Sequence, residues 1–240
     1  MPYNNVERVR KGVGGIFMDI TPIARIRSDF PEKFGLPRQS GLVEALTATV
    51  VFEPEFRDPA ALRGLEGFSR IWLIWEFSQA IREGWSPTVR PPRLGGHVRL
   101  GVFATRSPFR PNPLGLSCVR LREIRRDRAL GPVLIVAGAD LLDGTPIYDV
   151  KPYLPYADCR PDAVGGFAAR PKEADLTVEC PPALLDRVPA DKRSALLAVL
   201  AQDPRPQYQD DPERVYGMAF AGLEIKFQVA GDRLAVTEIL

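Results

Sequence analysis

Histidine and cysteine are scarce in this sequence. His97 is the single histidine among 240 residues, and the three cysteines, Cys118, Cys159 and Cys180, lie far apart and form no CxxC pair. Metal sites built from several histidines or cysteines are therefore disfavoured, and His97 is the one residue that could serve as the base of a Ser-His-Asp triad. An odd number of widely spaced thiols is typical of a reducing compartment. We expect no metal and a cytoplasmic protein.

Long apolar runs and several familiar ligand motifs are also absent. No stretch of about eighteen apolar residues predicts a membrane-spanning helix, and residues 1–18 are polar and lack the apolar core of a secretory signal. The sequence has no GxGxxG, Walker or GxSxG motif. This argues against a Rossmann-type nucleotide site, nucleoside triphosphate hydrolysis and an α/β-hydrolase nucleophile. Two classes of function remain: a group transfer that depends on positioning the reactants, or binding without a chemical reaction.

Positive charge is unevenly distributed along the chain. The formal net charge is only +2, but residues 82–128 contain eleven arginines, no lysine and three acidic residues. Arginine favours bidentate contacts with phosphate and stacking on nucleobases. This segment therefore predicts nucleic-acid binding, with an ordinary solvated basic face as the alternative.

The most informative stretch runs from Gly101 to Gly115 and contains three prolines. Proline lacks a donor and fixes φ, so this stretch cannot be a helix interior or a central strand. Arg106 and Arg110 lie on the stiffened loop, beside Ser107 and Asn112. A rigid loop loses little entropy when a ligand binds, so we predict a preorganised site for an anionic or carboxylate-bearing partner. The alternative is a proline-braced surface turn.

Three further loops combine charged side chains with proline or glycine, at residues 37–39, 140–144 and 203–208. The second can equally be a hairpin turn, because Asp143-Gly144 is a common turn pair. The third can equally end the helix that precedes it, because proline often follows a helix terminus.

Short β-branched and aromatic runs between glycine and proline turns favour an antiparallel barrel or sandwich over a doubly wound sheet. Trp72 and Trp75 are predicted core aromatics, and Asp58 is predicted to cap a short helix over 59–65. The predicted strands of this region are 20–26, 46–52, 68–77, 99–103, 115–124, 133–139 and 145–149.

The composition changes at residues 158–174, which reads as a linker rich in proline and glycine. Beyond it, the apolar spacing predicts helices over 182–188 and 191–200, with Asp191 able to cap the second. Strands are predicted at 215–220 and 223–229, to which 234–239 can add a third. This part is therefore expected to be a small α+β domain.

Several motifs resemble the TrmO (TsaA-like) family of S-adenosylmethionine-dependent tRNA methyltransferases. Residues 101–117 read GVFATRSPFRPNPLGLS, and the resemblance extends from about residue 19 to residue 240. Other matching segments are 36–39 (LPRQ), 63–66 (RGLE), 90–96 (RPPRLGG), 143–146 (DGTP), 151–155 (KPYLP) and 203–206 (DPRP).

The resemblance implies a mainly β fold and a tRNA substrate. One antiparallel sheet rolled into a β-barrel would occupy residues 19–170 and bind the cofactor, and a small α+β domain with the DPRPxY loop would occupy 171–240. Residues 1–18 would be a flexible extension with no assigned role. The family acts as a homodimer and methylates N6 of threonylcarbamoyl-adenosine at position 37 in the anticodon loop of threonine tRNAs.

The same resemblance implies a set of cofactor-binding residues. Arg106 would pair with the methionine carboxylate, Asp140 or Asp143 would bind ribose hydroxyls or the amino group, and Leu116 would pack on adenine. The full implied set is Pro37, Arg38, Gln39, Ser78, Gln79, Arg106, Leu116, Asp140, Leu141, Leu142 and Asp143.

The C-terminal motif implies the catalytic and RNA-facing residues. Asp203, Arg205 and Tyr208 would act at the target base, with Asp203 or Tyr208 as candidate proton acceptor. RNA contacts would come from Arg93, Arg110 and Arg205. The acidic run after Tyr208 departs from the family pattern, in which a basic residue often follows this tyrosine.

Three other functions remain open from the residues. The chain could bind S-adenosylmethionine as a regulatory module without transferring a methyl group. It could methylate another adenosine or a small metabolite. It could also be a purely structural RNA-binding barrel.

Overall fold

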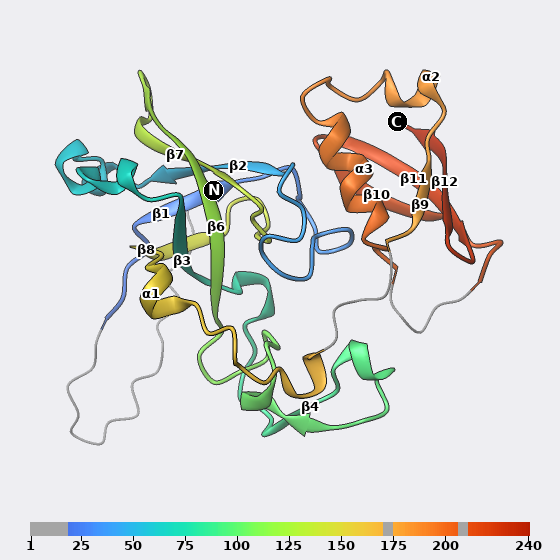
Figure 1. Ribbon diagram of the computed structural model, residues 1–240, viewed down its shortest axis with the longest axis horizontal. Coiled ribbons are helices and arrows are strands. Elements are labelled where there is room, and N and C mark those ends of the chain that lie inside the picture. Colours follow the sequence, from blue (N-terminus) through green and yellow to red (C-terminus); the bar gives the residue numbers. More distant parts are fainter. Residues whose placement is uncertain (1–18, 170–174, 206–210) are drawn as a thin grey trace.

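The computed structural model describes residues 19–169, 175–205 and 211–240, and six of its strands form one antiparallel sheet (Figure 1). The sheet order is β1-β2-β7-β6-β3-β8, and β1 also pairs with β8, so the sheet closes into a barrel. The predicted mainly antiparallel β architecture is confirmed. The strands are β1 (Ala24–Arg27), β2 (Thr47–Phe52), β3 (Arg70–Glu76), β6 (Leu114–Asp127), β7 (Gly131–Ala137) and β8 (Pro146–Pro152).

Alternation along the strands fills the barrel interior. In β3, Ile71, Leu73 and Trp75 are buried, and the residues between them are only partly covered. Side chains of a strand alternate between its two faces, so every second residue of β3 points inward. The inward residues form an apolar cluster with Ala24, Ile26, Val50, Val119, Leu134, Val136 and Ile147.

The prediction that Trp72 is a core aromatic was wrong. Trp72 and Trp75 are three positions apart on one strand and therefore lie on opposite faces of the sheet. Trp75 is buried inside the barrel, whereas Trp72 is half-buried outside it. Its indole Nε1 donates to Asp158 Oδ2 at 3.0 Å, and its ring lies 5.8 Å from that of Tyr153.

The capped helix after β2 is present in a tighter form. The Asp58 carboxylate accepts a hydrogen bond from the Ala60 amide at 2.8 Å, as predicted for a cap. The segment forms two 3₁₀ turns, η2 (Pro59–Leu62) and η3 (Leu65–Gly67), after a first turn η1 (Pro54–Phe56). Gly64 separates η2 from η3 with a φ of 89°, which glycine adopts at no steric cost.

Residues 77–113 leave the barrel between β3 and β6 and form a separate excursion (Figure 1). It contains a two-stranded ribbon and three 3₁₀ turns. The predicted strand over 99–103 was therefore mostly wrong, since only two of its residues pair; the partner strand is flanked by Pro87 and Pro91, which cannot donate to a ladder. The elements are η4 (Ser78–Ala80), β4 (Thr88–Val89), η5 (Pro92–Leu94), β5 (Leu100–Gly101) and η6 (Val102–Ala104).

The C-terminal part packs a helix against a four-stranded sheet of order β10-β11-β12-β9. The predicted strands β10, β11 and β12 are confirmed, and β9, which pairs parallel to β12, was not predicted because it spans only three residues. Asp191 does not cap α3: Lys192 stands at the cap position, and its side chain makes no capping hydrogen bond. The elements are α1 (Pro155–Asp158) and η7 (Gly166–Ala168), then β9 (Thr177–Glu179), α2 (Pro182–Leu185), α3 (Arg193–Ala201), β10 (Tyr216–Phe220), β11 (Leu223–Ala230) and β12 (Arg233–Ile239).

The loop between β1 and β2 joins the two parts of the molecule. Phe30 belongs to the apolar cluster of the C-terminal sheet, and its ring meets Phe220 edge-on at 5.4 Å. The Lys192 ammonium donates to the Asp29 carboxylate in an ion pair at 2.6 Å, and the Asp29 carbonyl accepts a hydrogen bond from the Ala221 amide at 2.9 Å. The two parts are therefore in contact although the predicted linker separates them in sequence, because Phe30 of this loop packs into the core of the C-terminal part. The exact domain limits stay a prediction.

Within the part of the chain that the structure describes, no helix is long and apolar enough to cross a bilayer.

Gly115 of β6 lies directly opposite Trp75 of β3. A Cβ at Gly115 would overlap the indole, at 2.5 Å from its Cζ2 atom. We therefore expect Gly115→Ala to lower the free energy of unfolding by about 1–3 kcal/mol, the usual cost of overpacking a core. Urea unfolding measures this change.

Gly101→Ala is the matched control. Gly101 has a negative φ, and a Cβ there would meet nothing within 4 Å, so its effect should stay within about 0.5 kcal/mol. Equal unfolding midpoints for the two variants would show that the Trp75 contact is not tight.

Candidate functional site

A cavity of about 660 Å³ lies where the excursion meets the barrel. Its walls come from four places in the chain: the loop before β2, the residues after β3, the proline-rich loop with the start of β6, and the turn after β7. Three of the four polar loops predicted from the sequence therefore meet around one space.

Nine of the eleven predicted cofactor residues line this cavity. They are Pro37, Arg38, Gln39, Ser78, Gln79, Arg106, Leu116, Asp140 and Leu142. The other two, Leu141 and Asp143, do not line it. Leu141 is buried in the barrel cluster, and its carbonyl accepts the Ser28 hydroxyl at 2.9 Å. The Asp143 carboxylate accepts the Ser28 amide at 3.0 Å and thereby holds the start of the loop after β1.

Arg106 projects from the proline-rich loop into the cavity wall. Its guanidinium donates to the Gln39 side-chain carbonyl, and the Gln39 amide nitrogen donates to the Arg38 carbonyl. Arg110, on the same loop, donates to the Thr105 carbonyl at 2.9 Å and so braces the loop from within. The two arginines therefore differ: Arg106 reaches across to another loop, and Arg110 fixes the shape of its own.

Asp140 is held in the cavity wall by a buried chain of hydrogen bonds. The Trp75 indole donates to the Ser117 hydroxyl at 2.9 Å, and that hydroxyl donates to Asp140 Oδ1 at 2.5 Å. Ser117 is completely buried. Burial raises the pKa of the Asp140 carboxyl, while the Ser117 hydroxyl and the positive charge of Arg106 act against that rise.

The loop at residues 203–205 contacts this wall from the C-terminal part. Arg205 is 9% exposed, and its guanidinium binds both oxygens of the Asp203 carboxylate at 2.9 and 3.3 Å. Asp203 has a φ of 52°, a left-handed conformation that is uncommon outside glycine. Arg38 donates to the Arg205 carbonyl at 3.0 Å. The predicted catalytic loop is therefore tied to the cavity through a residue that lines it.

Several predicted residues lie elsewhere. Tyr208 and the side chain of Arg93 lie outside the described residues, although Pro92 next to Arg93 lines the cavity. His97 is exposed in a turn of the excursion and does not line the cavity. Among residues 19–169, 175–205 and 211–240, no group of three or more histidine, cysteine or acidic side chains is arranged to hold a metal ion.

Sequence reasoning missed Ser117, Trp75 and Glu76. Glu76 lines the cavity at the end of β3, and its carboxylate accepts the Tyr148 hydroxyl at 3.0 Å. A signal was present for Ser117: it occupies an inward position of a strand whose other inward residues are small or apolar. A buried hydroxyl in such a position needs a polar partner.

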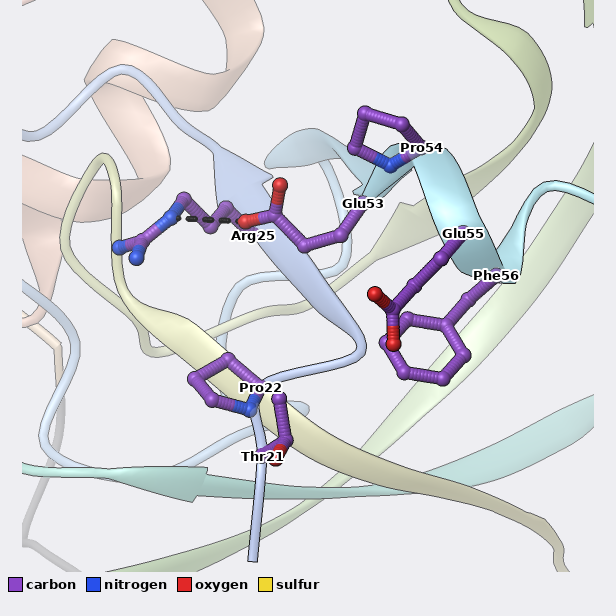
Figure 2. A pocket seen from close by; sticks show the side chains of 7 residues that line it. All are labelled: Thr21, Pro22, Arg25, Glu53, Pro54, Glu55 and Phe56. Atoms are coloured by element: carbon purple, nitrogen blue, oxygen red, sulfur yellow. Dashed lines mark hydrogen bonds and ion pairs between the residues drawn. The ribbon is translucent and has the colours of Figure 1, made fainter.

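A second pocket, of about 430 Å³, lies where the chain enters the barrel and is lined by none of the predicted site residues (Figure 2). Among the described residues that line it, the one basic residue, Arg25, pairs with Glu53 at 3.0 Å and donates to the Gly144 carbonyl at 3.2 Å. Arg25 therefore links β1 to the residue that follows β2 and to the turn that precedes β8. We regard the larger cavity as the functional candidate.

Comparisons with known proteins all point to one family. Residues 25–159 match the family model of the tRNA-methyltransferase O N-terminal domain, and residues 173–240 match that of the TrmO C-terminal domain. A tRNA (adenine(37)-N6)-methyltransferase of Escherichia coli is 42% identical over 86% of this chain and 91% of its own length. One of Eikenella corrodens is 49% identical over 68% and 91%.

A solved structure is equally similar in fold. The crystal structure of TrmO from Pseudomonas aeruginosa superimposes with a TM-score of 0.77 and 34% identity, covering 94% of this chain and 99% of that one. The match therefore includes both the barrel and the C-terminal part.

Ser117→Ala tests the buried hydrogen-bond chain. The Trp75 indole would lose its acceptor, so we expect the free energy of unfolding at neutral pH to fall by about 1–3 kcal/mol. The pKa of Asp140 should rise further, because one donor to its charged form is lost. A carboxyl whose pKa is raised by folding loses stability as the pH rises from its usual value of 3.8 to the raised value.

The difference between wild type and variant should therefore be smallest in acid, grow across this window and stay constant above it. Urea unfolding from acid to neutral pH measures it. Ser194→Ala, at an exposed position of α3, is the control. If the loss of unfolding free energy in Ser117→Ala were the same at every pH, Ser117 would have no effect on the ionisation of Asp140.

Proposed function

Because this chain belongs to the TrmO family, we propose that it is a tRNA (adenine(37)-N6)-methyltransferase that uses S-adenosylmethionine as methyl donor. The observation that carries the proposal is the shared cavity, which gathers nine residues of the cofactor set implied by the sequence motifs. The finer parts of the proposal are that the target adenosine carries a threonylcarbamoyl group, that the tRNA is a threonine tRNA, and that the protein acts as a homodimer.

The cavity has the size and chemistry that the cofactor requires. A volume of about 660 Å³ lies within the usual range for small-molecule sites. Leu114, Leu116 and Phe77 supply an apolar wall for a purine ring, and Arg106 supplies a cation for a carboxylate. Asp140 supplies an acceptor for an amino group or a ribose hydroxyl. When bound, S-adenosylmethionine supplies an electrophilic methyl group on a sulfonium.

The protein's own residues would hold the nucleophile and handle its proton. The exocyclic nitrogen of adenine is a poor nucleophile because its lone pair is delocalised, so alignment and removal of a proton are the tasks left to the enzyme. Asp203 and Tyr208 are the candidate acceptors. Two contacts support a role for this loop: the ion pair with Asp203 fixes the Arg205 guanidinium, and the Arg205 carbonyl accepts a hydrogen bond from Arg38, which lines the cavity.

Arg205 and Arg110 are the candidates that would neutralise the threonylcarbamoyl carboxylate. Both guanidinium groups are held by hydrogen bonds, that of Arg205 to the Asp203 carboxylate and that of Arg110 to the Thr105 carbonyl. A guanidinium in a fixed orientation recognises a carboxylate at lower entropic cost than a mobile one.

Methyl transfer to defined tRNAs tests the function. The protein is incubated with tritium-labelled S-adenosylmethionine and with threonine tRNA that carries or lacks the threonylcarbamoyl group. We expect label in N6-methylated adenosine at position 37 of the modified tRNA, and none in a tRNA with guanosine at that position. Cofactor binding without transfer would favour a regulatory module, and label at another adenosine would favour a different methyltransferase.

Arg106→Ala should weaken S-adenosylmethionine binding about 10- to 150-fold, because a charge-assisted hydrogen bond is worth about 1.5–3 kcal/mol. Isothermal titration calorimetry measures the affinity. Arg122→Ala is the control, since Arg122 is exposed on the same strand as Leu116 and lies outside the cavity. An unchanged affinity in Arg106→Ala would refute the role of Arg106.

Arg205→Ala should abolish methylation and leave cofactor affinity within about threefold. Arg38 donates to the backbone carbonyl of residue 205, which is present whatever side chain that residue carries. The cavity wall should therefore persist in the variant. Arg205→Lys keeps the charge and loses the fork that spans both Asp203 oxygens, so we expect a strong loss of turnover there too. Equal losses of affinity and turnover would contradict this division of roles.

A further inference from the structure

Exposed aromatic rings gather on the excursion that leaves the barrel between β3 and β6. Trp85 is 54% exposed and Phe103 is 72% exposed, although their ring centroids lie only 6.0 Å apart. The rings are tilted by 30°, so they form one broad apolar face rather than a buried contact. Side chains of this size on a surface indicate a partner more often than they indicate a fold requirement.

A second pair, formed by a guanidinium over a ring, lies on the same segment. The Arg82 guanidinium lies over the Phe109 ring at 3.7 Å from its centroid, and Phe109 is itself exposed. The neighbours of Phe109, Pro108 and Arg110, line the cavity, and so does Ala80, which lies two positions before Arg82. The Arg82–Phe109 pair therefore borders the candidate active site.

The charge of the segment is almost entirely of one sign. Residues 81–116 contain six arginines, no lysine and a single acidic residue, Glu83. In a symmetric dimer built on this surface, the same patch would face itself, and like charges would be brought together. A polyanion brings no such repulsion, and the arginines attract it. The charge therefore favours a nucleic acid over a second copy of the chain.

We propose that Arg82, Trp85, Phe103 and Phe109, which we call the stacking surface, bind unpaired bases of the tRNA loop that carries the target adenine. This inference rests on the proposed function. Proteins recognise single-stranded RNA by stacking its bases on aromatic rings and on guanidinium planes, and by following its backbone with arginines. All these groups are present on the excursion.

The reaction itself creates a need for such a surface. An adenine inside a stacked loop must leave its neighbours before its exocyclic nitrogen can enter a cavity, and unstacking costs a few kcal/mol. The rings of the excursion, of which Phe109 borders the cavity, replace the stacking that the neighbouring bases lose. The stacking surface thus lowers the cost of presenting the target base, and its effect falls on tRNA binding rather than on cofactor binding.

Substitutions at Phe103 separate stacking from simple apolar contact. Phe103→Leu keeps an apolar side chain and loses the ring, whereas Phe103→Tyr keeps the ring. We expect Phe103→Leu to raise the KM for tRNA about 5- to 150-fold, the range measured for loss of one base-aromatic stack. Phe103→Tyr should stay within about threefold of wild type. The affinity for S-adenosylmethionine should be unchanged in both variants.

The salt dependence of binding distinguishes the ring from the charges. Phe103→Leu removes no charge, so the slope of log affinity for an anticodon stem-loop against log salt should not change. Arg82→Gln should reduce that slope by about one. Tyr156→Ala is the control, because Tyr156 is 83% exposed in α1 and lies outside the stacking surface.

The outcomes are distinguishable from failure of the proposed function. If wild type methylates tRNA and Phe103→Leu keeps a wild-type KM, the stacking surface is wrong and the function stands. If wild type methylates no tRNA but binds the stem-loop in a Phe103-dependent manner, the function is wrong and the surface stands. If Phe103→Leu instead changes the mass measured by light scattering, the occupant is a second copy and the proposal is overturned.

Discussion

The contact on which most of the candidate site depends is the Trp75 indole lying against Gly115. Gly115 has no side chain, so the indole can occupy the space between β3 and β6 and still reach the Ser117 hydroxyl. Through Ser117 it orients Asp140, which lines the cavity. A single ring therefore belongs to the barrel core and also to the support of a cavity residue, so that core packing and site geometry are not independent.

The two parts of the molecule are connected in a similar manner. Phe30 and Leu142 belong to the apolar cluster of the C-terminal sheet, although they come from loops of the barrel. Leu142 also lines the cavity, and Arg38 binds the backbone of Arg205. The cavity is therefore built against the junction of the two parts. A shift of the C-terminal part would therefore move cavity residues directly, because Arg38 and Leu142 contact that part themselves.

Strand identity was predictable where one face of a strand had to be apolar, as in β2, β6, β7 and β8, because burial overrides other local preferences. It failed in residues 99–103, where the prolines that flank the partner strand limit pairing to two residues. It also failed for Trp72, where an aromatic run concealed a period of two. At the candidate site, proline and charge marked three loops that the fold brings together around the cavity. The support from Ser117 depends on the register of β3 against β6, which no local pattern encodes. Likewise, the family resemblance implied the whole stretch from Asp140 to Asp143, but only alternate residues of it, Asp140 and Leu142, line the cavity.

The excursion between β3 and β6 has a consequence for how this protein family can diversify. Its two ends are adjacent because β3 pairs along its whole length with the first half of β6, from Arg70 with Arg120 to Glu76 with Leu114. The ladder alone secures these ends, so the intervening segment can be lengthened, shortened or exchanged without changing the closure of the barrel. This segment supplies one wall of the cavity and also the exposed aromatic and arginine side chains. Selection for a different substrate can therefore act on one continuous piece of chain, and a swap of residues 77–113 between relatives is the natural unit for engineering specificity.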